Sequence, residues 1–189
     1  MQVKVTKITD NKLLNLCLEY SLPSDKRKEL NVSLKDIYVS EHSPIYSQIF
    51  VIELIGIPNF VHVHFRTHKK EFIFECARTF RTDKTNVKQD RNTPTDMIII
   101  CNAKKIIDIG LKRLCKKSSP ETIEVMQMIK EEFLLIDSDL HSFIVPKCVY
   151  RNGICNEPKC CGYIHTDNFQ TELSNYLFNF KHALKFVKV

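Results

Sequence analysis

Alternation of apolar and polar residues predicts strands in the first half of the chain. Residues 2–7 alternate with a period of two, and residues 47–55 are rich in β-branched and apolar side chains. The segment 56–58 contains Gly and Pro and is expected to end this second strand. Residues 71–76 show a further apolar strand pattern.

Apolar positions three and four residues apart predict the helices. The expected helices cover residues 34–40, 59–68, 96–115, a stretch that runs to about Leu135, and a C-terminal stretch from about Phe169. The first has a capping-box sequence at Ser33–Asp36, and the fourth follows a Ser-Ser-Pro-Glu start signal. The pattern of 59–68 also fits a strand, but Pro58 before it favours a helix. Residues 82–95 and 147–166 are predicted loops, and the predicted fold class is α+β.

Length and composition indicate one globular unit. The chain has 189 residues, of which 43% are apolar and 26% charged, which excludes a disordered, collagen-like or coiled-coil chain. No repeat or flexible linker interrupts it. We expect a main domain at 1–146, with a cysteine-rich loop and a C-terminal helix at 147–189 packed on it. The N-terminal residues show no secretion signal, no apolar run is long enough to span a membrane, and 4 glycines are too few for a glycine-rich phosphate loop.

Net charge points to an anionic partner. The formal charge is +6 and the isoelectric point is about 8.8. Basic residues are densest at 62–70, and Arg78 and Arg81 follow. We expect the lysines of this patch to form a solvated face. Arg66 and Arg78 lie beside apolar residues, so we expect them to bind phosphate through their planar guanidinium groups.

A second polar cluster lies between Asn102 and Glu121. Periodicity alone predicts an amphipathic helix with a charged outer face here. The order and spacing of three blocks of this chain resemble those of motifs in the flavin-dependent thymidylate synthases. The blocks are Glu41-His-Ser-Pro44; Arg66 and Arg78, which are 12 residues apart like the first and last arginines of the family signature; and Asn102-Ala-Lys104, Asp108 and Arg113, with Glu121 eight residues later.

This resemblance implies a fold, a reaction and a set of site residues. The implied fold is a mixed or antiparallel sheet with flanking helices. The implied reaction methylates dUMP at C5, with methylenetetrahydrofolate as carbon donor, reduced FAD as hydride donor and NAD(P)H as reductant. The implied FAD-binding residues are Ser43, Arg66, Thr67, His68, Lys69, Asn102, Lys104 and Asp108. The implied dUMP pocket consists of Arg66, Cys76, Ala77, Arg78 and Arg113, of which Arg78 and Arg113 are the implied catalytic and phosphate-binding residues.

The resemblance also implies a homotetramer with folate as a second substrate. It suggests a cytoplasmic protein of a bacterium or of a phage-infected cell, with no membrane partner and no nucleic-acid partner. Cys76 replaces a serine of the signature, and we expect it to be a small residue beside the nucleotide rather than a nucleophile.

Several signature positions differ from the family. Thr67 replaces a histidine, Phe74 a glutamate and Thr79 a tyrosine, while Val63 replaces a glutamine that contacts the uracil edge. These differences leave open a relative that modifies another pyrimidine nucleotide, or an inactive relative kept for assembly. A zinc-stabilised basic module that binds nucleic acid is a further alternative, since phenylalanines between the basic residues could stack on bases.

Eight cysteines without an export signal are expected to be thiols or metal ligands. Cys115, Cys148, Cys155 and Cys161 supply the four ligands that a structural zinc ion needs, and His165 is a spare ligand. The spacing lacks a C-x2-C pair. Reduced structural cysteines, or a disulfide in an oxidising compartment, therefore remain alternatives.

Overall fold

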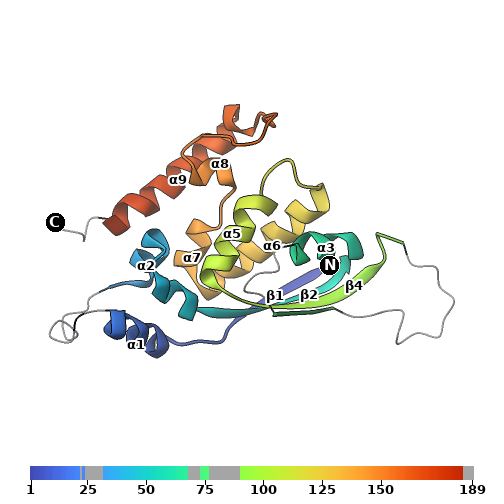
Figure 1. Cartoon of the computed structure of the whole chain (residues 1–189). Coiled ribbons are helices and arrows are strands. Elements are labelled where there is room, and N and C mark those ends of the chain that lie inside the picture. Colours follow the sequence, from blue (N-terminus) through green and yellow to red (C-terminus); the bar gives the residue numbers. More distant parts are fainter. Residues whose placement is uncertain (22, 24–31, 68–72, 77–89, 185–189) are drawn as a thin grey trace.

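Four antiparallel strands form the base of the molecule (Figure 1). The computed structural model describes residues 1–21, 23, 32–67, 73–76 and 90–184. Within these residues the strand order is β1-β2-β4-β3, and the strands are Gln2–Lys7 (β1), Ile49–Pro58 (β2), Ile73–Cys76 (β3) and Pro94–Asn102 (β4). Val5 of β1 pairs with Ile52 of β2, and Ile52 pairs with Ile99 of β4. This order makes β2 and β4 the central strands.

Helices cover one face of this sheet. The buried side chains of β2 include Phe50, Ile52 and Leu54, which alternate along the strand and so share one face. Phe50 packs edge-on against Phe133 of α6 (Pro120–Ile136), with ring centroids 5.0 Å apart. Helices α5 (Ala103–Arg113) and α6 lie above the strands in Figure 1. The core of the molecule therefore lies between the sheet and these helices.

The predicted long helix over 96–115 is wrong in its first third. Residues 96–102 belong to β4, where Met97, Ile99 and Cys101 are buried and the residues between them are less so. Asn102 then caps α5, because its side-chain oxygen accepts the Lys105 amide N–H at 2.9 Å. The helix therefore starts where a capping residue is available rather than where the apolar run begins.

The strand break expected at 56–58 is also wrong. Strand β2 continues to Pro58, and the extra residue is absorbed by a register shift between Leu54 and Ile57. Gly56 has a φ of +65°, a conformation that glycine adopts at little cost, and its N–H donates to Asp96 Oδ1 at 2.8 Å. Pro58 then occupies the N-cap position of α3 (Asn59–Arg66), without a side-chain cap hydrogen bond.

Most other predicted elements are confirmed. These are β1, β2 from Ile49, β3 within 73–76, α2 (Leu34–Ser40) with its Ser33–Asp36 capping box, α3 (Asn59–Arg66), α6, and α9 (Asp167–Leu184). Residues 82–89 of one predicted loop lie outside the described residues, and 94–95 belong to β4. The other predicted loop contains α8 (Lys147–Tyr150) and the 3-10 turn η3 (Tyr163–His165).

Two helices, α1 and α7, were not predicted from the sequence. Helix α1 (Asn11–Ser21) begins after Asp10, whose carboxylate accepts backbone N–H groups of its first turn. Helix α7 (Ser138–Phe143) begins at Asp137, which also accepts hydrogen bonds from Lys7 Nζ at 3.0 Å and Tyr38 Oη at 2.7 Å. An aspartate that caps a helix is the signal in both cases.

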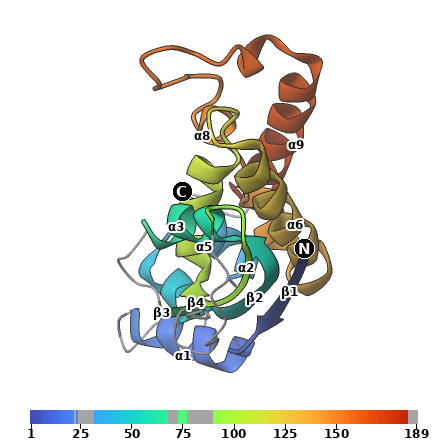
Figure 2. The ribbon, with the colours of Figure 1, turned by 90° about the vertical axis from the view of Figure 1, so that its right-hand side faces the viewer.

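The C-terminal helices lie at the end of the molecule away from the sheet. Helix α9 contacts α2 and α7, and α8 contacts α5 (Figures 1 and 2). The division of the chain at residue 146 stays a prediction. None of the helices in the described part of the chain has the length and apolar character needed to cross a bilayer.

Candidate functional site

Arg113 is fixed at the C-terminal end of α5 by hydrogen bonds to α3. Its Nη2 donates to the His64 carbonyl at 2.5 Å and to Thr67 Oγ1 at 2.7 Å. Burial lowers the pKa of Arg113, but an arginine remains charged in water at any ordinary pH. The structure thus brings together two residues of the predicted site, Arg113 and Thr67.

Three polar side chains extend this cluster to the start of α6. His64 Nδ1 lies 2.7 Å from Thr122 Oγ1, and Thr122 Oγ1 lies 2.9 Å from Ser119 Oγ. Ser119 is the N-cap residue of α6. The pKa of His64 is lowered by burial and then by the charges of Arg113 and Arg91, which favours the neutral imidazole. Through these contacts the N-terminus of α6, a helix of 17 residues, lies beside His64, whose carbonyl binds Arg113.

A cavity of about 500 Å³ opens beside this cluster. Arg113, His64, Ser118 and Ser119 line one part of it, and Glu157 is its only carboxylate among the described residues. Its lining also includes the lysines Lys112, Lys116, Lys117 and Lys147. Positive side chains and a helix N-terminus both favour a bound anion. We call this space the basic cavity.

At the N-terminal end of α5, a lysine is paired with carboxylates. Lys104 Nζ lies 3.1 Å from Glu41 Oε2 and also forms an ion pair with Asp108. Tyr150 Oη donates to Glu41 Oε1 at 3.0 Å. One cation of this group therefore faces two carboxylates, so the group itself has one excess negative charge, while Lys105 adds a second cation in the first turn of α5. We call Lys104, Glu41, Asp108 and Tyr150 the Lys104 cluster.

Of the other described residues of the predicted site, some are exposed and one is buried. Ser43 is exposed at the start of the 3-10 turn η2 (Ser43–Ser47), and Arg66 and Thr67 are exposed at the end of α3. Asn102 uses its side chain to cap α5. His68, Lys69, Ala77 and Arg78, and the side chain of Cys76, lie outside the described residues.

The structure separates the predicted site into two parts. Lys104 and Asp108 form one pair, whereas Thr67 and Arg113 form the other. Nine residues of α-helix separate Lys104 from Arg113, which corresponds to about 14 Å at a rise of roughly 1.5 Å per residue. Within one subunit, the described residues predicted to bind FAD are therefore not gathered at one point.

Several residues of these clusters escape the sequence analysis. Glu41 was part of a matched block, but its pairing with Lys104 joins segments far apart in the chain. Lys116 and Lys117 directly follow the Arg113 helix, and Ser119 was noted only as a helix start signal. The adjacency of two lysines, a helix cap and Arg113 in the sequence is the signal that could have indicated an anion site.

The predicted metal ligands line the same basic cavity. Cys115, Cys148, Cys155 and Cys161 all contribute to its wall, together with Cys160. All the cysteines with described side chains are free thiols. Within the described part of the chain, no group of three or more His, Cys, Asp or Glu side chains is placed so that it could hold a metal ion. The four predicted zinc ligands thus line one cavity, but their side chains are not arranged to bind an ion.

Comparisons with known proteins identify the fold only. No protein-family model matches the chain, and no curated protein matches it. The UMP/dUMP methylase PolB from Streptomyces cacaoi, solved with 5-Br dUMP, is 9% identical with a TM-score of 0.53, over 75% of this chain and 94% of that chain. Thymidylate synthase X from Helicobacter pylori, solved with FAD and dUMP, is 10% identical with a TM-score of 0.55, over 74% of this chain and 99% of that chain. The predicted fold class, α+β and similar to the flavin-dependent thymidylate synthases, is confirmed.

Proposed function

We propose that this chain is an enzyme that binds a pyrimidine nucleoside monophosphate, with the phosphate in the basic cavity. The observation that carries the proposal is the anchored Arg113, which lines this cavity beside the N-terminus of α6. A phosphate dianion needs fixed, charged donors, and a guanidinium group held by two hydrogen bonds loses little entropy when it binds one.

The proposed reaction is reductive methylation of dUMP at C5. Methylenetetrahydrofolate would supply the carbon, reduced FAD the hydride and NAD(P)H the electrons, as the sequence resemblance implies. The support is the order of the three sequence blocks and the fold shared with two proteins solved with dUMP or 5-Br dUMP. In the proposed mechanism Arg113, and Arg78 with it, orients the nucleotide through its phosphate.

The residue that would select the base differs from the one in the flavin-dependent thymidylate synthases. Val63 stands where the family has a glutamine that contacts uracil, and its side chain is 52% exposed on α3. A valine cannot form hydrogen bonds to a base edge. Another pyrimidine nucleotide is therefore the alternative substrate, and discrimination between bases is expected to be weak.

The fit of FAD to the described residues is poor within one subunit. Lys104 is paired with Glu41 and Asp108, so it does not present a net positive charge to a pyrophosphate. Asn102 already caps α5, which leaves Ser43, Arg66 and Thr67 as the described residues best able to contact the cofactor. The proposal that FAD is the cofactor therefore rests on the sequence resemblance and on the FAD bound in one structural neighbour.

A homotetramer would supply what one subunit lacks. The sheet face away from the helices carries half-buried Val51, Ile98 and Ile100 beside the Lys4–Glu53 ion pair, a mixed surface that could pair between subunits. We propose this assembly, with the site completed across subunits, in the cytoplasm of a bacterium or of a phage-infected cell. Light scattering on a size-exclusion column tests the oligomeric state.

A visible absorption spectrum tests the function. The protein is incubated with FAD, desalted and measured before and after dUMP, with dCMP and deoxyuridine as controls. We expect a retained flavin band that shifts with dUMP and does not shift with deoxyuridine, which lacks the phosphate. Loss of all flavin would contradict the FAD proposal. Binding of single-stranded nucleic acid that weakens steeply with salt, without competition by dUMP, would favour the nucleic-acid module instead.

A further inference from the structure

The segment between α8 and α9 lacks a hydrophobic core of its own. It projects at the end of the molecule away from the sheet (Figures 1 and 2). Among residues 151–161 only 153 and 155 are partly buried, and Ile154 is 61% exposed. So little apolar burial cannot offset the conformational entropy that is lost when such a stretch is ordered. The contacts that hold this segment are therefore mainly backbone hydrogen bonds, and a crosslink would stabilise it.

Two tight turns fold the segment back on itself. Gly153 has a φ of +90° and its N–H donates to the Cys148 carbonyl at 2.7 Å. Gly162 has a φ of +85°, and its carbonyl accepts the His165 N–H at 3.0 Å in the 3-10 turn η3. Glycine adopts both conformations at low cost. The first turn places Gly153 beside Cys148, and the second begins directly after Cys161.

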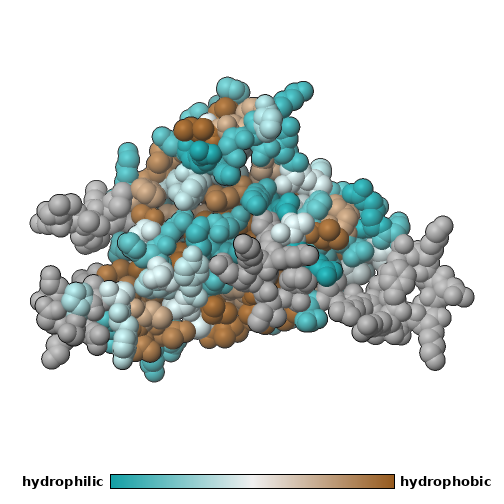
Figure 3. Space-filling view, in the orientation of Figure 1, coloured by the Kyte–Doolittle hydropathy of each residue, from teal (hydrophilic) through white to brown (hydrophobic). Residues whose placement is uncertain are grey.

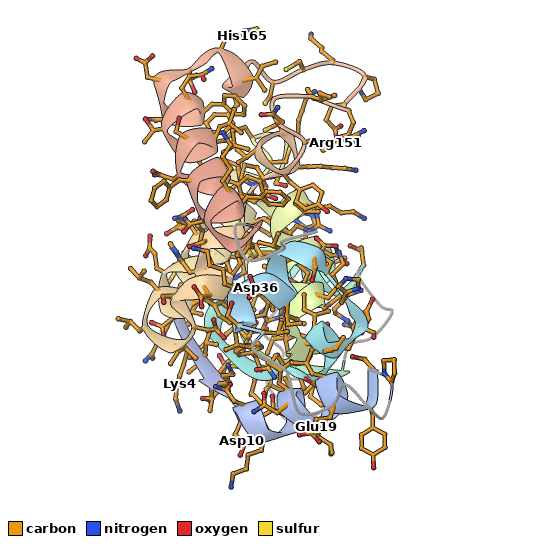
Figure 4. All side chains as sticks on the ribbon, turned by 90° about the vertical axis from the view of Figure 1, so that its left-hand side faces the viewer. Lys4, Asp10, Glu19, Asp36, Arg151 and His165 are labelled. Carbon is orange, nitrogen blue, oxygen red and sulfur yellow. The ribbon has the colours of Figure 1, made fainter. Side chains whose placement is uncertain are left out.

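Soft metal ligands stand at the start, middle and end of these turns. Cys148 lies in α8, Cys155 follows the first turn and Cys161 precedes the second. All three thiols line the basic cavity, and Cys161 interacts electrostatically with both of the others. His165 follows Cys161 by one turn of 3-10 helix, and Figure 4 shows it at the same end of the molecule as Arg151, opposite Asp10 and Glu19.

We propose that Cys148, Cys155, Cys161 and His165 bind one Zn²⁺ ion, a Cys3His site that holds the segment between α8 and α9. A structural zinc ion takes four such ligands in a tetrahedron. As placed, no three of these side chains are grouped closely enough to hold an ion, and His165 is not among the residues that line the basic cavity. Cys161 and His165 are exposed, so their side chains can change rotamer at low cost to complete the tetrahedron.

The two remaining thiols near the site are assigned no role as ligands. Cys160 Sγ accepts the Gly162 N–H at 3.4 Å and is also in side-chain contact with Cys155 and Cys161, so it is the neighbour that the variants below must separate from the ligands. Cys115 follows α5 and lies near Cys148, but it belongs to a different part of the chain. The ligand set expected from the sequence is therefore changed at one position, with His165 in place of Cys115. Three thiolates and Zn²⁺ leave one negative charge, which the lysines of the basic cavity stabilise.

Metal analysis of the full-length protein tests this site. The protein is purified without a metal-affinity tag, zinc is measured by mass spectrometry, and Co²⁺ is then exchanged in. We expect about one zinc ion per chain, together with the visible bands of tetrahedral Co²⁺ and a thiolate-to-cobalt charge-transfer band. Each of Cys148→Ser, Cys155→Ser, Cys161→Ser and His165→Ala should weaken Co²⁺ binding on the order of 100-fold or more.

Matched variants separate ligands from neighbours. Cys160→Ser is adjacent to a proposed ligand and equally exposed, and Cys115→Ser removes the other nearby thiol; both should retain the Co²⁺ spectrum. Circular dichroism shows whether each variant keeps its helices, and chelator titration of the unmodified protein needs no variant at all. Absence of bound metal, or protection of these cysteines as disulfides, would overturn the site. Loss of metal in Cys115→Ser or Cys160→Ser, or its retention in His165→Ala, would overturn the ligand set. None of these outcomes depends on nucleotide binding.

Discussion

The two ends of α5 place basic side chains in opposite electrostatic surroundings. At the N-terminal end, Lys104 is held between Glu41 and Asp108. At the C-terminal end, Arg113 is held by the His64 carbonyl and the Thr67 hydroxyl, which are neutral partners. Both side chains are ordered, but the two contacts of Lys104 are to carboxylates, whereas these two contacts of Arg113 are to neutral oxygens.

This difference shows that a basic residue in a motif is not yet an anion site. Lysine and arginine bind phosphate only if nearby carboxylates leave their charge available. The surface in Figure 3 is hydrophilic over much of the middle of the face shown and apolar along its lower edge. The partners of each cation distinguish the two ends of α5.

Acidification is expected to have the largest effect, because it destabilises α3, the helix that fixes Arg113. His62 of α3 is 1% exposed, its Nδ1 lies 3.0 Å from Thr95 Oγ1, and burial lowers its pKa to about 4. In the unfolded chain this histidine binds a proton below its ordinary pKa of about 6.5, whereas the folded chain does so only near its lowered pKa. The free energy of unfolding should therefore fall by roughly 3 kcal/mol as the pH falls through this window, and stay unchanged above it.

Urea denaturation at a series of pH values measures this loss. The comparison variant is His62→Asn, whose amide can still bond to Thr95 but does not titrate. It should be less stable than the unmodified protein at neutral pH, yet lose less stability on acidification. If the two proteins lost stability in parallel, His62 would not be the group responsible.

Removal of Arg113 gives the next largest effect. Arg113→Ala should weaken dUMP binding by roughly 2 kcal/mol, about 30-fold, because a charged hydrogen-bond donor to the phosphate is lost. Lys104→Ala is the matched control at the other end of the same helix and should change dUMP affinity little. Isothermal titration calorimetry at two salt concentrations measures both. Equal losses in the two variants would mean that the two ends do not differ as proposed.

The apolar run at the start of the 96–115 segment shows why the fold could be predicted only in part. The strands and helices with one clear periodicity, such as β1 and α6, were predicted from the sequence. Strand β4 was not, because Ile98 and Ile100 are half-buried on the face opposite Ile99, and a strand with apolar residues on both faces loses its alternation. The run then fits a helical period as well as a strand.

The site was predictable to a similar extent. Arg113 follows from motif spacing, and its place beside Lys116, Lys117 and the start of α6 is visible in the sequence. Its anchoring by the His64 carbonyl depends on a contact with α3, 49 residues away. The neutralisation of Lys104 depends on Glu41 in the same way. No local pattern reports such contacts, because they arise from tertiary packing.

A smaller effect should follow from restoring the family residue at the N-terminal end. Asp108 stands where the flavin-dependent synthases have an asparagine, and Asp108→Asn leaves Lys104 with a single carboxylate partner, Glu41. Flavin affinity should then rise several-fold, on the order of 1 kcal/mol, because one negative charge beside Lys104 is removed. Fluorescence titration of FAD measures the change, with Asp139→Asn as a control carboxylate on another helix. A fall in affinity would show that Asp108 itself contacts the flavin favourably.

The smallest expected effect is a pKa shift at His64, which reports whether the charge of Arg113 acts within the cluster. Burial, Arg113 and Arg91 lower the pKa of His64 in that order, and Glu121 raises it. Arg113→Ala removes one of the lowering charges, so the pKa of His64 should rise toward its ordinary value. Lys104→Ala should leave it in place, since Lys104 lies about 14 Å along α5 from Arg113 and salt screens charges over about 10 Å. NMR titration of the His64 ring proton resolves the two variants. A shift in the Lys104 variant as large as that in the Arg113 variant would mean that the two ends of α5 share one electrostatic environment, and the basic cavity would then no longer be distinguished from the Lys104 cluster as the phosphate site.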